Sequence, residues 1–421
     1  MARTIVEINE KIARGDAIVL TAQEVCDIVK SGGDLTIEDV DVVTTATRAI
    51  MSGTYAVLSF PIADPCSFVR AEHVLINGVP GNVGPCPNER LGIIDLMVFG
   101  TSHSKERPDY GGGHLFRDLV EGKEVQVKVD TEEGSSFEKA ITLEDIPYAR
   151  IFSTRNAFMN YVAFINPGSS QLSTIFNAVD FPPGLTCATV SGCGQINPIK
   201  NDPYLETIGV GTRILLNGAQ GFVVGTGTRS MKTRPNLLGL ADMHHMDPEY
   251  MGGFVTSAGP ECIGSWAVPI PVLNESILEN IKKLDRDISL PIMDVNIRQT
   301  ICKTNYEDVW GGSDLEIELD PGRCVSCKSC AVEPVCPMRA ITFEKGRIER
   351  DKERCFNCGL CASQCIGGAF KANLGIVNFE GKRIPILVRQ SDRARAIRLA
   401  ETLKLQILKG SFRITQMVEH I

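Results

Sequence analysis

Hydrophobic and polar positions along the first 45 residues follow patterns that predict short helices and strands in turn. The expected elements are a helix over residues 4–13, a strand over 17–20, a helix from Thr21 to about Lys30 and a buried strand over 40–45. Thr21 and Glu24 have the spacing of a capping box, in which each side chain bonds the other residue's backbone N–H at a helix start. Helices that alternate with buried strands are typical of a mixed α/β domain.

Glycine and proline divide the middle of the chain into shorter apolar segments. Residues 50–115 predict mainly loops, in which glycines 111–113 form a flexible connection or a close backbone approach. Residues 184–230 predict β-hairpins with glycine at the turns. Gly209 and Gly211 lead into strand-type residues, not into a helix, and so do not match a dinucleotide-binding fingerprint.

The last 50 residues predict a hairpin followed by a helix. The hairpin spans residues 375–388, and the helix begins after Ser391 and ends at Gly410. The apolar positions of this helix recur at helical spacing and predict a stripe that faces the core: Ala396, Leu399, Ala400, Leu403 and Ile407.

Composition and charge exclude several classes of protein. The 421 residues are 43% hydrophobic and 22% charged, as in ordinary globular chains. No apolar run approaches the ~18 residues of a membrane helix, and the first residues carry charges where an export signal needs an apolar core, so we expect a cytoplasmic protein without membrane association. The last 101 residues carry a net charge of +9 and the first 320 carry −17. No aromatic-interleaved basic patch accompanies the basic part, so we expect no nucleic-acid partner; the basic part faces the acidic body or an acidic partner.

Cysteine is the most informative residue type. Eight of the 15 cysteines lie between 324 and 365, in two CxxCxxC runs that are each followed by a fourth cysteine. Three thiolates of one run bind one [4Fe–4S] cluster in such a motif, and the fourth cysteine binds the other cluster. The predicted ligands are Cys324, Cys327, Cys330 and Cys365 for one cluster, and Cys336, Cys355, Cys358 and Cys361 for the other.

A disulfide framework and a zinc site both fit the cysteine runs less well than iron–sulfur clusters do. Disulfides need an oxidising compartment, and zinc sites typically use two CxxC pairs or mixtures of cysteine and histidine. The runs resemble bacterial-type two-cluster ferredoxins, except that five residues instead of three precede Cys336, and Ile366 stands where proline often follows. The pattern leaves open whether the clusters carry electrons, hold shape or bind a substrate.

Segments outside the cysteine runs resemble a known family. They are VDVVTT (40–45), STRNAFMNY (153–161), GQINPIKNDP (194–203), IGVGTRILLNGAQGFVVGTGT (208–228), VPIPVLNE (268–275) and RQSDRARAIRLAETLKLQILKGSF (389–412). Together they are similar to the homocysteine-biosynthesis, sulfur-incorporation proteins, which include the L-aspartate semialdehyde sulfurtransferases. With cluster motifs in the same chain, the sequence most resembles the branch called methanogenesis marker 16 metalloproteins.

The resemblance implies a reductive sulfur transfer. Sulfide is captured on the enzyme as a persulfide or thiolate adduct, delivered to a carbonyl carbon, and the product is reduced with cluster electrons. This chemistry needs a nucleophilic thiolate in a positive field. The resemblance also implies a cysteine just after VDVVTT, where this chain has Met51 and Ser52, and another near GSSFEKA, where it has Ser135 and Ser136.

The remaining cysteines are the candidates to replace that thiol chemistry. Cys66 and Cys86 lie in proline-containing loops that hold a sulfur in place, and the glycines around Cys193 leave its sulfur approachable. We predict that these three are the catalytic set and that at least two of them lie within reach of a common pocket; burial as a small hydrophobic residue is the alternative for each.

Three polar residues are candidate substrate contacts. Arg155 and Asn156 belong to the STRN segment, and a loop arginine is a natural anchor for a carboxylate, with an internal ion pair as the alternative. His114, which follows glycines 111–113, is another candidate contact.

These patterns predict a mixed α/β main domain, residues 1–317 and 372–421, with a bacterial-type 2[4Fe–4S] ferredoxin-like α+β module inserted at 318–371. We expect an enzyme that performs a reductive sulfur-transfer or thiol-forming step in methanogen sulfur or cofactor metabolism. Its substrates would be a small thiol or carbonyl compound and a sulfide donor, and its two [4Fe–4S] clusters would receive electrons from an external donor. A homo-oligomer is compatible with this hypothesis. The alternative is a non-enzymatic electron-transfer or cluster-delivery protein that docks a client.

Overall fold

The computed structural model describes residues 3–84, 89–156, 161–232 and 234–421. Within these ranges the largest sheet has 14 strands, and every pairing in it except β1–β2 is antiparallel. The strands follow the order β1 (Val19–Thr21), β2 (Val42–Ile50), β16 (Gly259–Pro271), β12 (Arg213–Leu216), β13 (Ala219–Thr226), β14 (Leu237–Asp242), β9 (Tyr148–Asn156), β3 (Thr54–Pro61), β6 (Ile93–Phe99), β5 (Val79–Val83), β4 (Ala71–Ile76), β7 (Val125–Thr131) and β8 (Ser136–Ile141), and β15 (Gly252–Thr256) pairs with β16.

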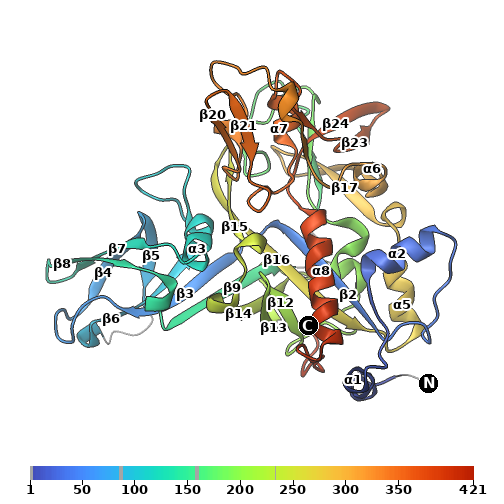
Figure 1. The fold of residues 1–421 in the computed structure, drawn as a ribbon, viewed down its shortest axis with the longest axis horizontal. Helices are drawn as coiled ribbons and strands as arrows, with labels where there is room; N and C mark the ends of the chain where they lie inside the picture. The colour runs from blue at the N-terminus through green and yellow to red at the C-terminus, as the bar shows by residue number, and fades with distance from the viewer. Residues whose placement is uncertain (1–2, 85–88, 157–160, 233) are drawn as a thin grey trace.

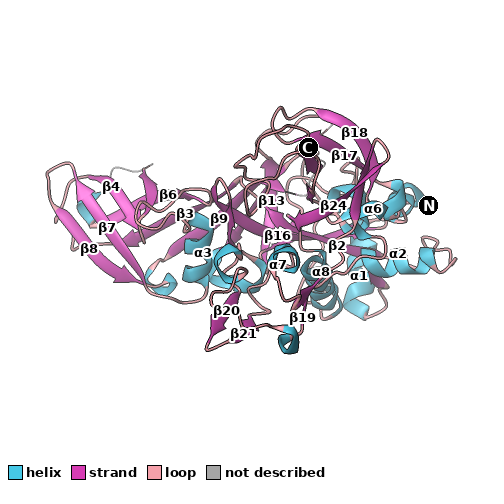
Figure 2. Cartoon of the chain, turned by 90° about the horizontal axis from the view of Figure 1, so that it is seen from above, coloured by secondary structure: helices cyan, strands magenta, loops and turns pink. Residues whose placement is uncertain are grey.

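One end of this sheet extends away from the rest of the molecule. Strands β3 to β8 and helix α3 (Gly112–Val120) form this extension, which we call the wing and which lies at the left of Figures 1 and 2. The other end of the sheet, with β2 and β16, forms the centre of the body, where every residue of β16 after its first is buried. The body and the wing therefore share one sheet but present separate surfaces.

A second sheet joins the C-terminal hairpin to the body. Its six described strands lie in the order β18 (Thr300–Asn305), β17 (Ser289–Asp294), β10 (Ala163–Ile165), β11 (Ala188–Val190), β24 (Lys382–Arg389) and β23 (Ile376–Phe379). The hairpin predicted over residues 375–388 is confirmed as β23 and β24, and β24 pairs in parallel with β11. The C-terminal segment is thus an integral part of the body.

Helix α8 (Arg393–Leu408) runs across β1, β2 and β16 (Figure 1). The predicted apolar stripe of this helix is confirmed, since all five of its residues are buried. The helix begins one residue later than expected, because the carboxylate of Asp392, not the hydroxyl of Ser391, accepts the N–H of Arg395 as the N-cap. Gly410 follows its end in a left-handed conformation, as expected for a helix stop.

The helices at the start of the chain match the sequence closely. α1 (Ile5–Arg14) and α2 (Ala22–Lys30) each begin with a complete capping box, and the predicted Thr21–Glu24 pair is confirmed. α5 (Glu275–Ile281) ends before Asp285, whose carboxylate accepts the N–H of Gln195. In the described ranges no helix has the length and apolar content to cross a membrane.

The prediction that residues 50–115 are mainly loops is wrong. This stretch forms β3, β4, β5, β6 and the start of α3. Asn77 and Gly78 both have positive φ and turn β4 into β5. An Asn-Gly pair between strand-forming residues is a strong hairpin indicator, and it would have identified these strands in the sequence.

Glycines 111–113 form a close backbone approach and not a flexible connection. A Cβ on Gly112 would lie 2.1 Å from the carbonyl oxygen of Phe99, and one on Gly113 would lie 2.7 Å from that of Gly252. These contacts press the start of α3 against β6 and β15, which fixes the helix at the junction between the wing and the body.

Residues 318–371 form a small unit that lies on top of the body in Figure 1, and we call it the cysteine module. Strands β19 (Glu318–Leu319) and β22 (Phe370–Lys371) pair where the chain enters and leaves the unit. Between them are the hairpin of β20 (Ile341–Glu344) and β21 (Arg347–Arg350) and the short helix α7 (Leu360–Gln364). Because β19 and β22 pair with each other, the module does not interrupt the surrounding sheets.

A buried ion network holds the cysteine module against the body. Asp392 accepts from Arg48 of β2 at 2.9 Å and from Arg395 at 3.0 Å, and the side chains of Arg48 and Asp392 are 0% exposed. Arg395 also donates to the backbone oxygens of Cys355, Lys352 and Glu353 in the module. One carboxylate therefore links β2, α8 and a cysteine loop.

We predict that Asp392→Ala destabilises the protein by about 3–5 kcal/mol, because it leaves Arg48 and Arg395 as buried, uncompensated charges. Urea denaturation of anaerobically purified protein, followed by circular dichroism, measures the change. The matched control is Asp16→Ala, which removes an exposed ion pair with Arg14 and should cost less than about 1 kcal/mol. Equal losses in the two variants would contradict this role for Asp392.

Candidate functional site

Four of the predicted cluster cysteines surround one cavity in the cysteine module. Cys336, Cys355, Cys358 and Cys361 all line it, although Cys336 belongs to the first run and the other three to the second. The cysteine motif predicts this grouping, because the fourth cysteine of each run binds the cluster of the other run. The rest of the wall is almost wholly apolar and comprises Ile317, Val332, Val335, Pro337, Met338, Ala340, Ile341, Arg350, Phe356, Gly359 and Leu360.

The cavity lies against the body of the protein. Phe356, between two of the cysteines, packs edge-to-face on Phe254 of β15 with ring centroids 5.3 Å apart. Val255 of β15 donates its N–H to the carbonyl oxygen of Pro337, and Arg389 of β24 donates its N–H to that of Cys358. Both runs are thereby anchored to the body next to the cavity.

The surroundings of these thiols suit sulfur ligands of a metal cluster. The N–H of Ala340 points at Cys336 Sγ at 3.4 Å, and the N–H of Asn357 points at Cys355 Sγ at 3.5 Å. Burial, together with neighbouring Cys355 and Cys336, raises the pKa of Cys361 to about 12. Ligation removes these thiol protons, and N–H groups directed at sulfur stabilise the resulting negative charge.

The other four predicted ligands do not line this cavity. Cys324, Cys327, Cys330 and Cys365 are half-buried, as are three of the four cysteines of the cavity. Ala369 directs its N–H at Cys365 Sγ at 3.3 Å, as Ala340 does at Cys336. The loops beside them expose apolar side chains, with Val325 63% and Ile366 86% accessible. In the described residues, no group of three or more His, Cys, Asp or Glu side chains is arranged to hold a single metal ion.

Cys193 is fully buried. The glycines around it do not leave its sulfur approachable, contrary to expectation, because Gly192 lies against Tyr306 and Gly194 against Asp285. Its Sγ contacts Thr47 Oγ1 at 3.6 Å, and burial raises the pKa of its thiol. In this conformation Cys193 is a protonated thiol inside the core.

Cys66 lies far from that environment. It is exposed in the loop between β3 and β4 of the wing, with a φ of 68°. Cys86 lies outside the described residues. The structure therefore does not bring Cys66 and Cys193 into a common pocket, and it does not describe the third member of the predicted set.

Arg155 and Asn156 lie at the end of β9, where Asn156 is opposite Leu237 of β14. Their side chains are outside the part of the chain that the structure describes. Their proposed role as substrate contacts stays a prediction.

The two positions where the family resemblance implies a cysteine lie on separate surfaces. Met51 is buried at the end of β2, next to Gly264 of the adjacent strand β16. Ser135 and Ser136 are exposed in the turn between β7 and β8, at the tip of the wing. Met51 donates its N–H to the carbonyl oxygen of Cys262, a buried cysteine whose pKa burial raises to about 12.

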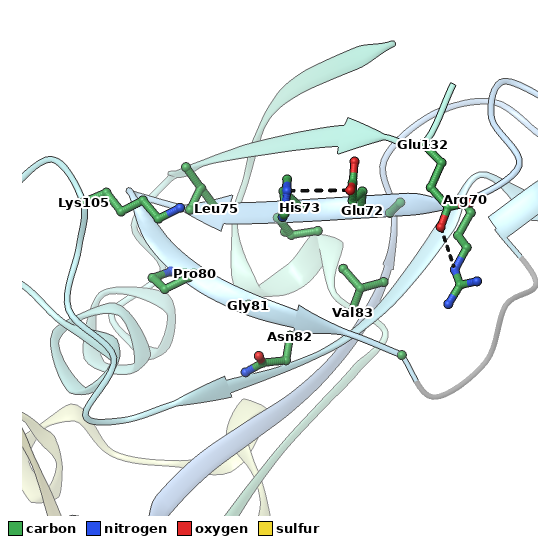
Figure 3. Close-up of a pocket in the computed structure, with 13 residues that line it drawn as sticks. Arg70, Glu72, His73, Leu75, Pro80, Gly81, Asn82, Val83, Lys105 and Glu132 are labelled. Carbon is green, nitrogen blue, oxygen red and sulfur yellow. Dashed lines mark ion pairs between the residues drawn. The ribbon is translucent and has the colours of Figure 1, made fainter. Parts of the chain in front are cut away.

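An open groove of about 620 Å³ lies over β4 and β5 of the wing (Figure 3). Two ion pairs lie among its lining residues, Arg70–Glu132 at 3.5 Å and His73–Glu72 at 4.0 Å. The 13 described residues that line it include no cysteine. Because it contains neither a thiol nor a buried polar group, we do not assign the sulfur chemistry to it.

Comparison with known proteins identifies the family. Residues 17–414 match the sequence profile of the family described as "Homocysteine biosynthesis enzyme, sulfur-incorporation". An uncharacterized protein of Methanothermobacter thermautotrophicus is 48% identical, over 97% of this chain and 94% of that protein. The chain therefore belongs to the homocysteine-biosynthesis, sulfur-incorporation family.

Two other relatives carry informative names. The L-aspartate semialdehyde sulfurtransferase of Methanocaldococcus jannaschii is 33% identical over 76% of this chain, and the match spans 64% of that protein. An uncharacterized ferredoxin of the same organism is 41% identical over 75 residues, which is 17% of this chain and 47% of the ferredoxin. No solved structure matches the chain. The relatives support a sulfur-related protein with iron–sulfur clusters.

We predict that the folded protein reacts with iodoacetamide at Cys66 and not at Cys193. Alkylation needs an accessible thiolate, which burial denies to Cys193. Peptide mass spectrometry of anaerobically labelled protein, before and after denaturation, measures both sites. Labelling of Cys193 in the folded protein at the rate of Cys66 would contradict the prediction.

Proposed function

We propose that the protein is an iron–sulfur enzyme that performs a reductive sulfur-transfer or thiol-forming step in methanogen sulfur or cofactor metabolism. The observation that carries the proposal is the four-cysteine cavity at the boundary between the cysteine module and the family body. Family membership and the sulfurtransferase relative support the sulfur chemistry. The ferredoxin relative supports clusters in the same chain.

We propose two [4Fe–4S] clusters, an inner and an outer one. Cys336, Cys355, Cys358 and Cys361 are the ligands of the inner cluster, and Cys324, Cys327, Cys330 and Cys365 are those of the outer cluster. Burial raises the pKa of the Cys355 thiol, and the N–H of Asn357 and the positive charges of Arg350 and Arg395 act in the opposite direction. The apolar wall of the cavity keeps water from the inner ligands and, with the N–H groups directed at sulfur, tunes the potential.

The different surroundings of the two sets give electrons a direction. When bound, the clusters supply electrons for a reduction. Exposed Val325 and Ile366 beside the outer set suit contact with an external electron donor. The inner set lies against β15 and β24, so electrons that enter at the surface end at the body. The alternative is an electron-transfer or cluster-delivery protein, in which electrons follow the same route but the body binds no substrate.

The proposed reaction balances for an aldehyde substrate, the class named for the sulfurtransferase relative. The carbonyl oxygen leaves as water, hydrogen sulfide contributes the new C–S bond, and two electrons with two protons reduce the product to a thiol. The chain's task is to hold the carbonyl compound beside the sulfide and to exclude water.

Of the two described members of the predicted catalytic set, Cys193 is the one that backbone hydrogen bonds link to the inner cysteine loop, whereas Cys66 lies in the wing. The end of β24 bonds the inner cysteine loop through Arg389 N–H and Cys358 O, and the next residue, Gln390, donates its N–H to the oxygen of Val190. Ser391 Oγ then accepts the N–H of Gly192 at 2.7 Å, beside Cys193. A movement of this backbone segment would act on the cysteine cavity and on the Cys193 loop together.

We predict about eight iron and eight sulfide per chain in anaerobically purified protein. The double variant Cys336→Ser/Cys355→Ser should keep about four of each, because it removes two ligands of the inner cluster only. Iron and sulfide analysis with EPR measures the content. Cys302→Ser, a half-buried cysteine outside both runs, is the matched control and should keep eight. Four iron per chain in fully reconstituted wild-type protein would reject the two-cluster proposal.

We predict that deletion of the gene in a methanogen lowers the pool of one thiol metabolite and raises its carbonyl precursor. Mass spectrometry of thiol-labelled extracts from cells grown on sulfide measures both pools. Wild-type protein should restore the thiol, and Cys336→Ser/Cys355→Ser should fail to restore it. Unchanged thiol pools, together with loss of reduction of a client protein, would favour the electron-transfer alternative.

A further inference from the structure

A second pocket lies where α3 meets the cysteine module. Its lining comes from α3 and the segments around it, from β15 and from two loops of the module, and comprises Arg107, Tyr110, His114, Arg117, Asp118, Lys123, Gly253, Met338, Arg339 and Arg354. We call it the basic pocket. Its volume of about 210 Å³ equals that of about seven water molecules, so it fits a small molecule and not a peptide or a strand of nucleic acid.

Positive charge exceeds negative charge around the basic pocket. Five cationic side chains line it, and a single carboxylate, Glu121, pairs with three of them: Arg117 at 2.6 Å, Lys123 at 2.5 Å and Arg354 at 3.2 Å. Arg339 pairs with Asp109, and Lys123 also pairs with Asp118. Arg107 lies 3.8 Å above the ring of Tyr110 and pairs with no described acidic residue.

Two buried donors of the lining have no hydrogen-bond partner among the residues that the structure describes. They are Nε2 of His114 and Nη1 of Arg117. Nδ1 of His114 accepts the N–H of Gly111 at 3.2 Å, so the proton of the neutral ring is on Nε2. Burial, with a smaller effect from Arg339, lowers the pKa of His114 to about 4, so the ring is neutral at pH 7. A buried donor without an acceptor is costly, which favours an acceptor supplied by a ligand.

The histidine ring is held in one position. It stacks on Tyr110 with ring centroids 5.4 Å apart, and a Cβ on Gly253 would lie only 2.0 Å from its Nδ1. Only glycine at 253 leaves room for the ring. This fit fixes the direction of the donor at the pocket wall, as expected of a binding group and not of a side chain that packs loosely.

The basic pocket is adjacent to the four-cysteine cavity. Met338 lines both of them, and Arg339 is the third residue after Cys336. A molecule in the basic pocket would thus be separated from the proposed inner cluster by the side chain of Met338.

We propose that the basic pocket binds the oxyanion group, carboxylate or phosphate, of the small substrate. The conclusion that the bound molecule is a substrate rests on the proposed function. The existence of the binding site does not rest on it. His114 and Arg117 donate to the oxyanion, and Arg107 and Arg339 balance its charge. The pocket holds the substrate beside the proposed inner cluster and thereby orients its reactive carbon.

Isothermal titration calorimetry on anaerobically purified full-length protein tests the proposal, with inorganic phosphate and succinate as separate probes and succinamide as the uncharged control. Wild-type protein should bind at least one of the two anions and not succinamide. Binding of phosphate alone identifies a phosphorylated substrate, and binding of succinate alone identifies a carboxylate substrate. Failure of both anions to bind would overturn the proposal.

Two variants locate the site. His114→Phe and Arg339→Gln should each weaken anion binding by about tenfold or more, because each removes a donor or a charge from the pocket. Arg347→Gln, an exposed arginine of the same module, removes the same charge outside the pocket and should change the affinity less than about twofold. Equal weakening in all three would overturn the proposal. If His114→Phe does not fold, the exposed Arg339→Gln decides by itself.

Iron analysis of the same samples separates this proposal from the proposed function. Full iron content without anion binding rejects the basic pocket as a binding site and leaves the iron–sulfur proposal standing. Anion binding to a protein that carries no iron upholds the pocket and rejects the iron–sulfur proposal.

Discussion

The buried carboxylate of Asp392 is the constraint on which the arrangement of the molecule depends. It joins Arg48 from the centre of the large sheet to Arg395 of α8, and Arg395 reaches the backbone around Cys355. Asn357 also donates to Asp392, at 3.3 Å. Buried charges are tolerated only when they are paired and fully bonded, so the sheet, the helix and the cysteine loop must keep one relative position. The small cysteine module is thereby fixed to a much larger body.

That fixed position gives the two cysteine sets different surroundings. The inner set lies in an apolar cavity against β15 and β24, and the outer set lies near exposed apolar side chains such as Val325 and Ile366. In proteins that move electrons, access at one end and protection at the other define where electrons enter and where they are used. The proposed sulfur chemistry and the basic pocket both belong to the protected end, since Met338 forms a wall of each cavity.

The thiol chemistry has a different physical basis from the one that the sequence alone suggests. Cys193 lies in a glycine-rich segment, but the glycines permit close packing against Tyr306 and Asp285, so the sulfur is enclosed. Cys66 is exposed but lies in the wing, apart from the cysteine module. The segment from Arg389 to Ser391 bonds both the inner cysteine loop and the Cys193 loop, and its hydrogen bonds connect the two places.

The sequence by itself determined the features that depend on neighbours within a few residues: the capping boxes of α1 and α2, the stripe of α8, the hairpin of β23 and β24, and the spacing of the cysteine runs. The Asn-Gly turn at residues 77–78 also depends only on neighbouring residues, although we predicted loops instead of a hairpin there. Tertiary structure alone decided the burial of Cys193, the pairing of Arg354 with Glu121 and the meeting of His114 with Met338. These contacts join residues far apart in the chain, and only packing of the sheet, α3 and the cysteine module brings them together, because burial depends on the whole fold and not on local pattern.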